Sequence, residues 1–88
     1  MLDADIRDLA GQVIHSFKNA GWRLAIAESC TGGLISSVLT AQTGSSGVLD
    51  TSIVAYSNEA KEALLSVPKS LMVENGSVSA PVAKHMAG

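Results

Sequence analysis

Two kinds of side chain in the sequence could carry hydrolytic chemistry: a pair of hydroxyls and an inward-facing amine. Ser45 and Ser46 lie between two glycines, in a segment whose backbone N–H groups could also hold an oxyanion. A serine needs a base to become a nucleophile, and His15 and His85 are both expected on solvated helix faces. Lys61 is the remaining amine, so a serine–lysine dyad is chemically possible. Two serines between glycines are, however, far more often only a turn.

The position of Lys61 follows from the helical periodicity of residues 58–67. On a helical wheel it falls between Leu64 and Leu65 and away from the glutamates. The side chain could lie along the leucines with its ammonium in water, which is what the wheel alone favours. The alternative is a partly desolvated amine, which could serve as a base.

Residues 28–33 (ESCTGG) lie between an expected strand and an expected helix. Glycines there let a ligand approach the backbone, and free N–H groups before a helix attract anions, which hints weakly at a phosphate site. A tight turn capped by Thr31 is the simpler interpretation. Cys30 is interpreted as a small packing residue, and Glu28 could orient a neighbour or be solvated. No cluster of side chains has metal-ligand spacing, so neither a metal nor a cofactor is predicted.

The composition predicts one small domain, residues 1–88, with an aliphatic core, because 47% of the residues are hydrophobic but there is only one Phe, one Trp and one Tyr. The net charge of −2, with basic residues scattered singly, argues against a nucleic-acid partner. No apolar run is long enough to cross a membrane. A single cysteine excludes an internal disulfide and fits a reducing cytoplasm.

Hydrophobic periodicity predicts helices and short strands in alternation. The first helix should face the core with Leu2, Ile6, Leu9, Val13 and Phe17, and Gly21 should end it in a left-handed conformation. Strands are expected at 23–27 and 52–56, and helices at 3–20, from 34 to before 44, at 58–67, from 68 to about 74 and at 81–87, while the turn 44–47 could open a short helix through 49. The alternation predicts an α/β layered fold, and two strands alone make an incomplete sheet.

Three segments together carry a resemblance. AIAESCTGGLISSVLT, TGSSGVLDTSIVAYSNEAKEALLSV and GSVSAPVAKHMAG resemble the CinA C-terminal domain family, the nicotinamide-mononucleotide amidases, over nearly the whole chain. The resemblance implies a three-layer α/β/α sandwich. It also implies hydrolysis of the carboxamide of nicotinamide mononucleotide, which gives nicotinic acid mononucleotide and ammonia in pyridine-nucleotide salvage. Some members carry the domain in longer proteins named for competence and DNA damage.

The resemblance also assigns roles to individual residues. It places the family's nucleophilic serine on Ser46, with Ser45 as the rival, its lysine base on Lys61 and its associated tyrosine on Tyr56, which would hold the hydrogen-bond network. The residues expected to line the substrate pocket are Ser29, Thr31, Gly32, Gly33 and Ser45.

The family domain continues beyond the part that this chain matches, with further strands and a glycine-rich loop. The resemblance therefore implies that residues 1–88 correspond to its N-terminal half, an incomplete sandwich. Two functions are expected as alternatives: a serine–lysine amidase acting on a pyridine mononucleotide, and a catalytically silent module that binds a nucleotide or self-associates. Unpaired strand edges and the aliphatic faces of Leu34, Leu39, Leu64 and Leu65 predict a homo-oligomer.

Overall fold

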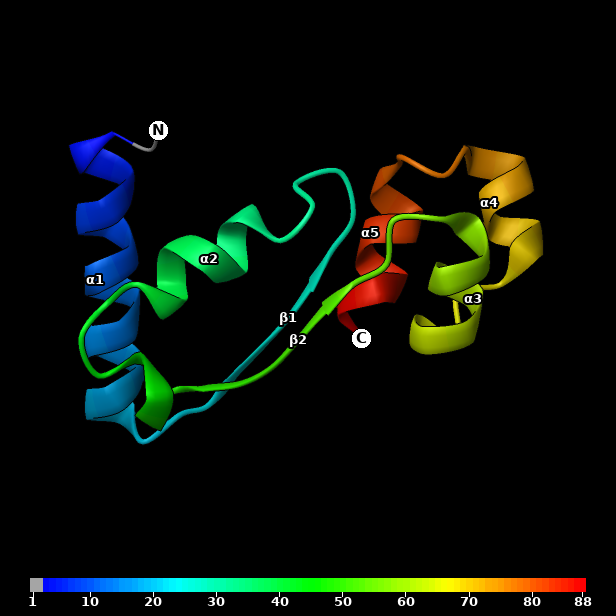
Figure 1. Ribbon diagram of the computed structural model, residues 1–88. Coiled ribbons are helices and arrows are strands. Elements are labelled where there is room, and N and C mark those ends of the chain that lie inside the picture. Colours follow the sequence, from blue (N-terminus) through cyan, green and yellow to red (C-terminus); the bar gives the residue numbers. More distant parts are fainter. Residues whose placement is uncertain (1–2) are drawn as a thin grey trace. The chain divides into compact units, whose positions relative to one another are not determined.

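The computed structural model describes residues 3–88, whose contacts divide into two compact units. The first unit holds the residues up to 26 and residues 33–52, and the second holds residues 27–32 and 53–88. The elements follow in the order α1 (Ala4–Ala20), β1 (Leu24–Glu28), α2 (Leu34–Thr40), the 3₁₀ turn η1 (Ser45–Gly47), β2 (Leu49–Val54), α3 (Asn58–Leu65), α4 (Lys69–Asn75) and α5 (Ala80–Ala87) (Figure 1). This alternation of helices and strands confirms the predicted α/β class.

The two strands form a two-stranded sheet. At one end of the sheet, the Leu24 N–H donates to the Val48 carbonyl at 2.8 Å. At the other end, the Ala55 N–H donates to the Glu28 carbonyl at 2.9 Å. The starts of the two strands thus meet each other, as do their ends, so the strands are parallel and α2 and η1 belong to the connection between them.

The core of the first unit forms where α1 packs on α2. Helix α1 begins at the N-cap Asp3, whose carboxylate accepts the Ile6 N–H at 2.9 Å, and it ends at Gly21 with φ 71°, the left-handed stop that the sequence predicts. The buried side chains are Ala10, Ile14, Val38, Leu39 and Val48.

The predicted core face of α1 is correct only in its second half. Val13 and Phe17 pack against the core, but Ile6 and Leu9 are 43% and 60% exposed, so their inward placement was wrong. The buried stripe of α1 runs instead along Ala10 and Ile14. A wheel shows which residues share a face, but it does not show where along the helix the neighbouring element packs. Leu2 lies outside the described residues.

The core of the second unit forms between its three short helices. Helices α3, α4 and α5 all pack on one another. Val67, Met72 and Val82 are buried there, with Leu65, Leu71 and Met86 packed against them. Both units therefore have the mainly aliphatic core that the composition predicts.

The predicted second strand was displaced toward the C-terminus. It spans Leu49–Val54 rather than 52–56, so Tyr56 follows the strand, and the short helix expected to reach residue 49 ends at Gly47. Asp50, Thr51 and Ser52 are all exposed, so the strand lacks the apolar run by which buried strands are recognised. Pairing with β1 places the start of β2 at Leu49, which the hydrophobic pattern does not predict.

Two further observations bear on the predicted partners. Within residues 3–88, no helix is long and apolar enough to cross a bilayer. Several large apolar side chains stay exposed, including Leu34 at 40% and Leu64 at 60%, whereas Leu39 is buried.

We expect Met72→Ala to lower the free energy of unfolding by about 2–5 kcal/mol, because it leaves a cavity in the core of the second unit. The neighbouring residue supplies a matched control. Val73 is 76% exposed, so Val73→Ala should change the stability by no more than about 0.5 kcal/mol. Urea denaturation followed by circular dichroism measures both effects, and equal losses would contradict the burial assigned to these two faces of α4.

Candidate functional site

The loop that follows β1 is anchored on a buried carboxylate. Glu28, the last residue of the strand, is only 3% exposed. The Thr31 hydroxyl donates to its Oε1 at 2.6 Å, a length typical of a hydroxyl bound to an ionised carboxylate. Of the two predictions for Glu28, the orienting role is thus correct. Thr31 ties the loop back to the strand, which agrees with the simpler interpretation of a tight turn capped by Thr31.

The two glycines of this loop are required by the backbone. Gly32 and Gly33 have φ values of 62° and 101°, in the left-handed region that side chains with a Cβ adopt only at a cost. A Cβ on Gly32 would meet no atom within 4 Å, so conformation and not space selects glycine there. The Gly32 N–H donates to the Ser29 carbonyl at 3.0 Å and closes the turn. Cys30 is exposed at its tip, so its interpretation as a packing residue was wrong.

Hydrogen bonds at both ends of α3 involve the backbone around Lys61. The Ser57 hydroxyl caps the helix by accepting the Ala60 N–H at 3.0 Å, and the Ser57 carbonyl accepts the Lys61 N–H at 3.1 Å. At the other end the Lys61 carbonyl accepts the Val67 N–H at 3.1 Å, across Ser66 in the left-handed conformation. The backbone of Lys61 is thus held from both directions.

The burial of the Lys61 side chain decides between the two sequence-based interpretations. Only 2% of the residue is exposed, so almost all of its side chain is enclosed by protein. No carboxylate among residues 3–88 lies within 4.0 Å of that ammonium. This burial agrees with the alternative interpretation, a partly desolvated amine, rather than with a side chain that lies on the helix surface.

Tyr56 emerges from the sheet next to the same strand end. Its predecessor Ala55 is fully buried and bonded to the Glu28 carbonyl, so the exit of β2 is fixed beside the exit of β1. The Tyr56 side chain itself is 73% exposed, and its hydroxyl makes no hydrogen bond within residues 3–88. Its role in a hydrogen-bond network stays a prediction.

The two serines of η1, in the first unit, differ in their hydrogen bonding. The Ser45 hydroxyl donates to the Thr40 carbonyl at 3.1 Å, and the Ser45 N–H donates to the Gln42 carbonyl at 3.2 Å. Ser46 is exposed, and neither its hydroxyl nor its N–H has a hydrogen-bond partner within residues 3–88. Of the two hydroxyls, only that of Ser46 makes no hydrogen bond within residues 3–88.

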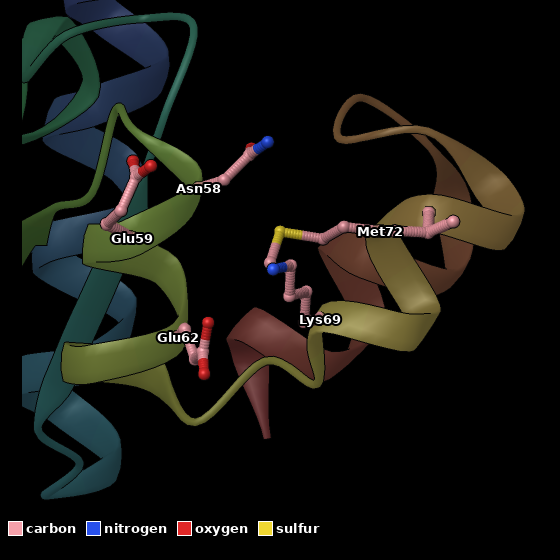
Figure 2. A pocket seen from close by; sticks show the side chains of 6 residues that line it. Asn58, Glu59, Glu62, Lys69 and Met72 are labelled. Atoms are coloured by element: carbon pink, nitrogen blue, oxygen red, sulfur yellow. The ribbon is translucent and has the colours of Figure 1, made fainter.

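A separate pocket opens in the second unit between α3 and α4. It has a volume of about 340 Å³, and Figure 2 shows Glu59 and Glu62 reaching it from α3 and Lys69 and Met72 from α4. None of the predicted site residues lines it, so the predicted chemistry is not assigned to this pocket. In the described part of the chain, no group of three or more His, Cys, Asp or Glu side chains could hold a metal ion.

The predicted site residues are divided between the two units. The second unit holds Lys61 and Tyr56 together with the loop residues Ser29, Thr31 and Gly32, and the bond between Ala55 and Glu28 joins the strand ends from which these segments depart. The first unit holds Gly33, Ser45 and Ser46.

Comparison with known proteins gives consistent matches. Residues 6–88 match the family described as "CinA C-terminal domain". The chain is 51% identical over 79 residues to a CinA-like protein of Synechococcus sp. (strain CC9902), covering 90% of this chain and 19% of that protein. It is 53% identical over 75 residues to a CinA-like protein of Geobacter metallireducens, covering 85% of this chain and 18% of that protein.

Solved structures are similar over the same residues. The competence/damage inducible protein CihA from Agrobacterium tumefaciens superimposes with a TM-score of 0.95 at 41% identity, covering 99% of this chain and 53% of that one. A competence-damaged protein (CinA) superfamily protein from Escherichia coli gives a TM-score of 0.90 at 30% identity, covering 98% and 51%. The chain thus spans about a fifth of these curated relatives and about half of these solved chains. It belongs to the family of CinA C-terminal domains.

Proposed function

We propose that the chain contributes the nucleophile and the base of an amidase, which hydrolyses the carboxamide of nicotinamide mononucleotide to nicotinic acid mononucleotide and ammonia. Membership of the CinA family supports the class of protein. The single observation that carries the proposal is the burial of Lys61, which is only 2% exposed and has no carboxylate within 4.0 Å in the described residues. Lysines are rarely buried unless they are paired with another charge, and such a lysine in a small unit suggests a chemical role.

In the proposed reaction, Lys61 in its neutral form takes the proton of the Ser46 hydroxyl as the oxygen attacks the carboxamide carbon. The tetrahedral intermediate collapses when the C–N bond breaks, and the lysine returns the proton so that ammonia leaves. Water then hydrolyses the acyl-serine ester to release the acid. The free N–H of Ser46 is a candidate donor to the oxyanion.

The assignment of Ser46 rather than Ser45 rests on hydrogen bonding within the first unit. The Ser45 hydroxyl donates a hydrogen bond to the Thr40 carbonyl. This bond orients the Ser45 oxygen and engages its O–H. The Ser46 hydroxyl has no such bond among the described residues. The single cysteine also fits our inference that the reaction takes place in a reducing cytoplasm.

Lys61→Met should lower the rate of ammonia release by about 10²–10⁴, because it removes the base but keeps a side chain that can be buried. Lys61→Arg should not restore activity, since a guanidinium stays protonated. Lys69→Met is the matched control: Lys69 is an exposed lysine of the same unit, and its loss should leave the rate unchanged. Ammonia release at the wild-type rate by Lys61→Met would disprove the dyad.

Ser46→Ala should abolish the covalent intermediate and reduce turnover by about 10³ or more, as removal of a catalytic serine does elsewhere. Ser45→Ala should cost much less, because that hydroxyl is already bonded to the backbone. Mass spectrometry of the protein trapped during turnover should find the acyl group on Ser46. An adduct on Ser45 or Cys30 would overturn the assignment.

We also propose that the chain self-associates. Each strand of a two-stranded sheet leaves one edge without a partner, and large apolar side chains such as Val54 and Leu64 are 45% and 60% exposed. Sedimentation equilibrium should therefore give a mass of two chains or more, and Leu64→Glu should shift it toward one. A wild-type chain that sediments as a monomer throughout the micromolar range would contradict self-association.

A further inference from the structure

Glu28 is a buried acidic side chain that has no role in the proposed reaction. It and Lys61 are the two buried charged or polar side chains in the described part of the chain, and both belong to the second unit. Lys61 has a proposed role as the base. Glu28 holds the Thr31 hydroxyl, and Thr31 is itself exposed on the loop expected to line the substrate pocket.

The bond between Glu28 and Thr31 fixes the direction of the Thr31 hydroxyl. The Thr31 hydroxyl is the donor and Glu28 Oε1 is the acceptor, at 2.6 Å. Its only proton is then committed to Glu28, while the lone pairs of its oxygen stay available. Thr31 can therefore accept a hydrogen bond from a ligand but cannot donate one.

The negative charge of Glu28 also disfavours binding of an anion at Thr31. A carboxylate held out of water is weakly screened, so it disfavours a second negative charge beside the Thr31 oxygen. An anion at that oxygen would meet a hydroxyl without a free proton and a neighbouring negative charge. This arrangement counts against the weak phosphate-site interpretation of the loop at Thr31.

We propose that Glu28 and Thr31 form a subsite that selects a hydrogen-bond donor, the –NH₂ of the substrate carboxamide, and rejects the carboxylate of the acid product. The inference rests on the proposed function and deepens it. Hydrolysis replaces a group with two N–H donors by a group with none, so the subsite loses its hydrogen bond and gains a repulsion at the same step. It would thereby distinguish substrate from product and favour product release.

Dissociation constants for nicotinamide mononucleotide and nicotinic acid mononucleotide test the proposal. They are measured by calorimetry in the Ser46→Ala background, so that the amide is not consumed. The unmodified subsite should bind the acid more weakly than the amide. Thr31→Val should weaken binding of the amide by about tenfold and leave the acid nearly unchanged, because only the amide loses a hydrogen bond.

Glu28→Gln should mainly change the binding of nicotinic acid mononucleotide. It keeps the shape of the side chain but removes the charge, and we expect it to strengthen binding of the acid by about tenfold with a smaller effect on the amide. Thr31→Ser keeps the hydroxyl and should preserve the wild-type ratio. Thr51→Val is the matched control, since Thr51 donates to the carboxylate of Asp50 on the exposed part of β2. Melting curves establish that each variant is folded.

The outcomes distinguish failure of this proposal from failure of the proposed function. Equal effects of Thr31→Val or Glu28→Gln on both nucleotides would overturn the selective subsite, because a merely structural bond would weaken both ligands alike. Wild-type turnover with tighter binding of the acid than of the amide would also overturn it. A wild-type chain that neither binds nor hydrolyses the amide would contradict the proposed function itself, and the subsite with it.

Discussion

The constraint on which the second unit depends is the burial of two charged side chains in a small structure. Glu28 and Lys61 are 3% and 2% exposed, and removal of an ion from water costs several kcal/mol even after the protein relaxes. The short hydrogen bond that Glu28 accepts from Thr31 offsets part of that free-energy cost. Lys61 has no carboxylate within 4.0 Å in the described residues, so packing must hold it in place.

Short-range backbone features supply the rigidity that this burial needs. Helix α3 has only eight residues, yet Ser57 caps its start, and a left-handed Ser66 lets the buried Val67 bond back to the Lys61 carbonyl. The loop after β1 is fixed in a similar way by two left-handed glycines and by the bond from Thr31 to Glu28. In each case, a few residues determine where a polar side chain lies.

Membership of the CinA family is shown, whereas the reaction is our proposal. The matched proteins are named CinA-like or competence/damage inducible and not for a reaction, so the proposed amidase chemistry rests on Lys61 and Ser46. The chain covers about half of the solved structures that it resembles. A subsite formed by Glu28 and Thr31 would be the part of substrate recognition that this chain carries itself.

The sequence by itself determined the α/β class, the order of the helices, the left-handed stop at Gly21 and the family, because these follow from local periodicity, from glycine conformation and from motifs read along the chain. It could only offer alternatives for Lys61 and Glu28. A helical wheel gives the direction of a side chain, but it does not show whether another element covers that direction.

Tertiary structure decided the rest. Packing of α3, α4 and α5 accompanies the burial of Lys61, pairing with β1 placed the start of β2 at Leu49 despite its polar residues, and the exposure of Cys30 followed from the turn around it. The difference in hydrogen bonding between Ser45 and Ser46 likewise depends on a bond to the Thr40 carbonyl, five residues away, which no property of the two serines reveals. Burial and hydrogen-bond partners belong to pairs of segments, and the sequence specifies them only through the fold.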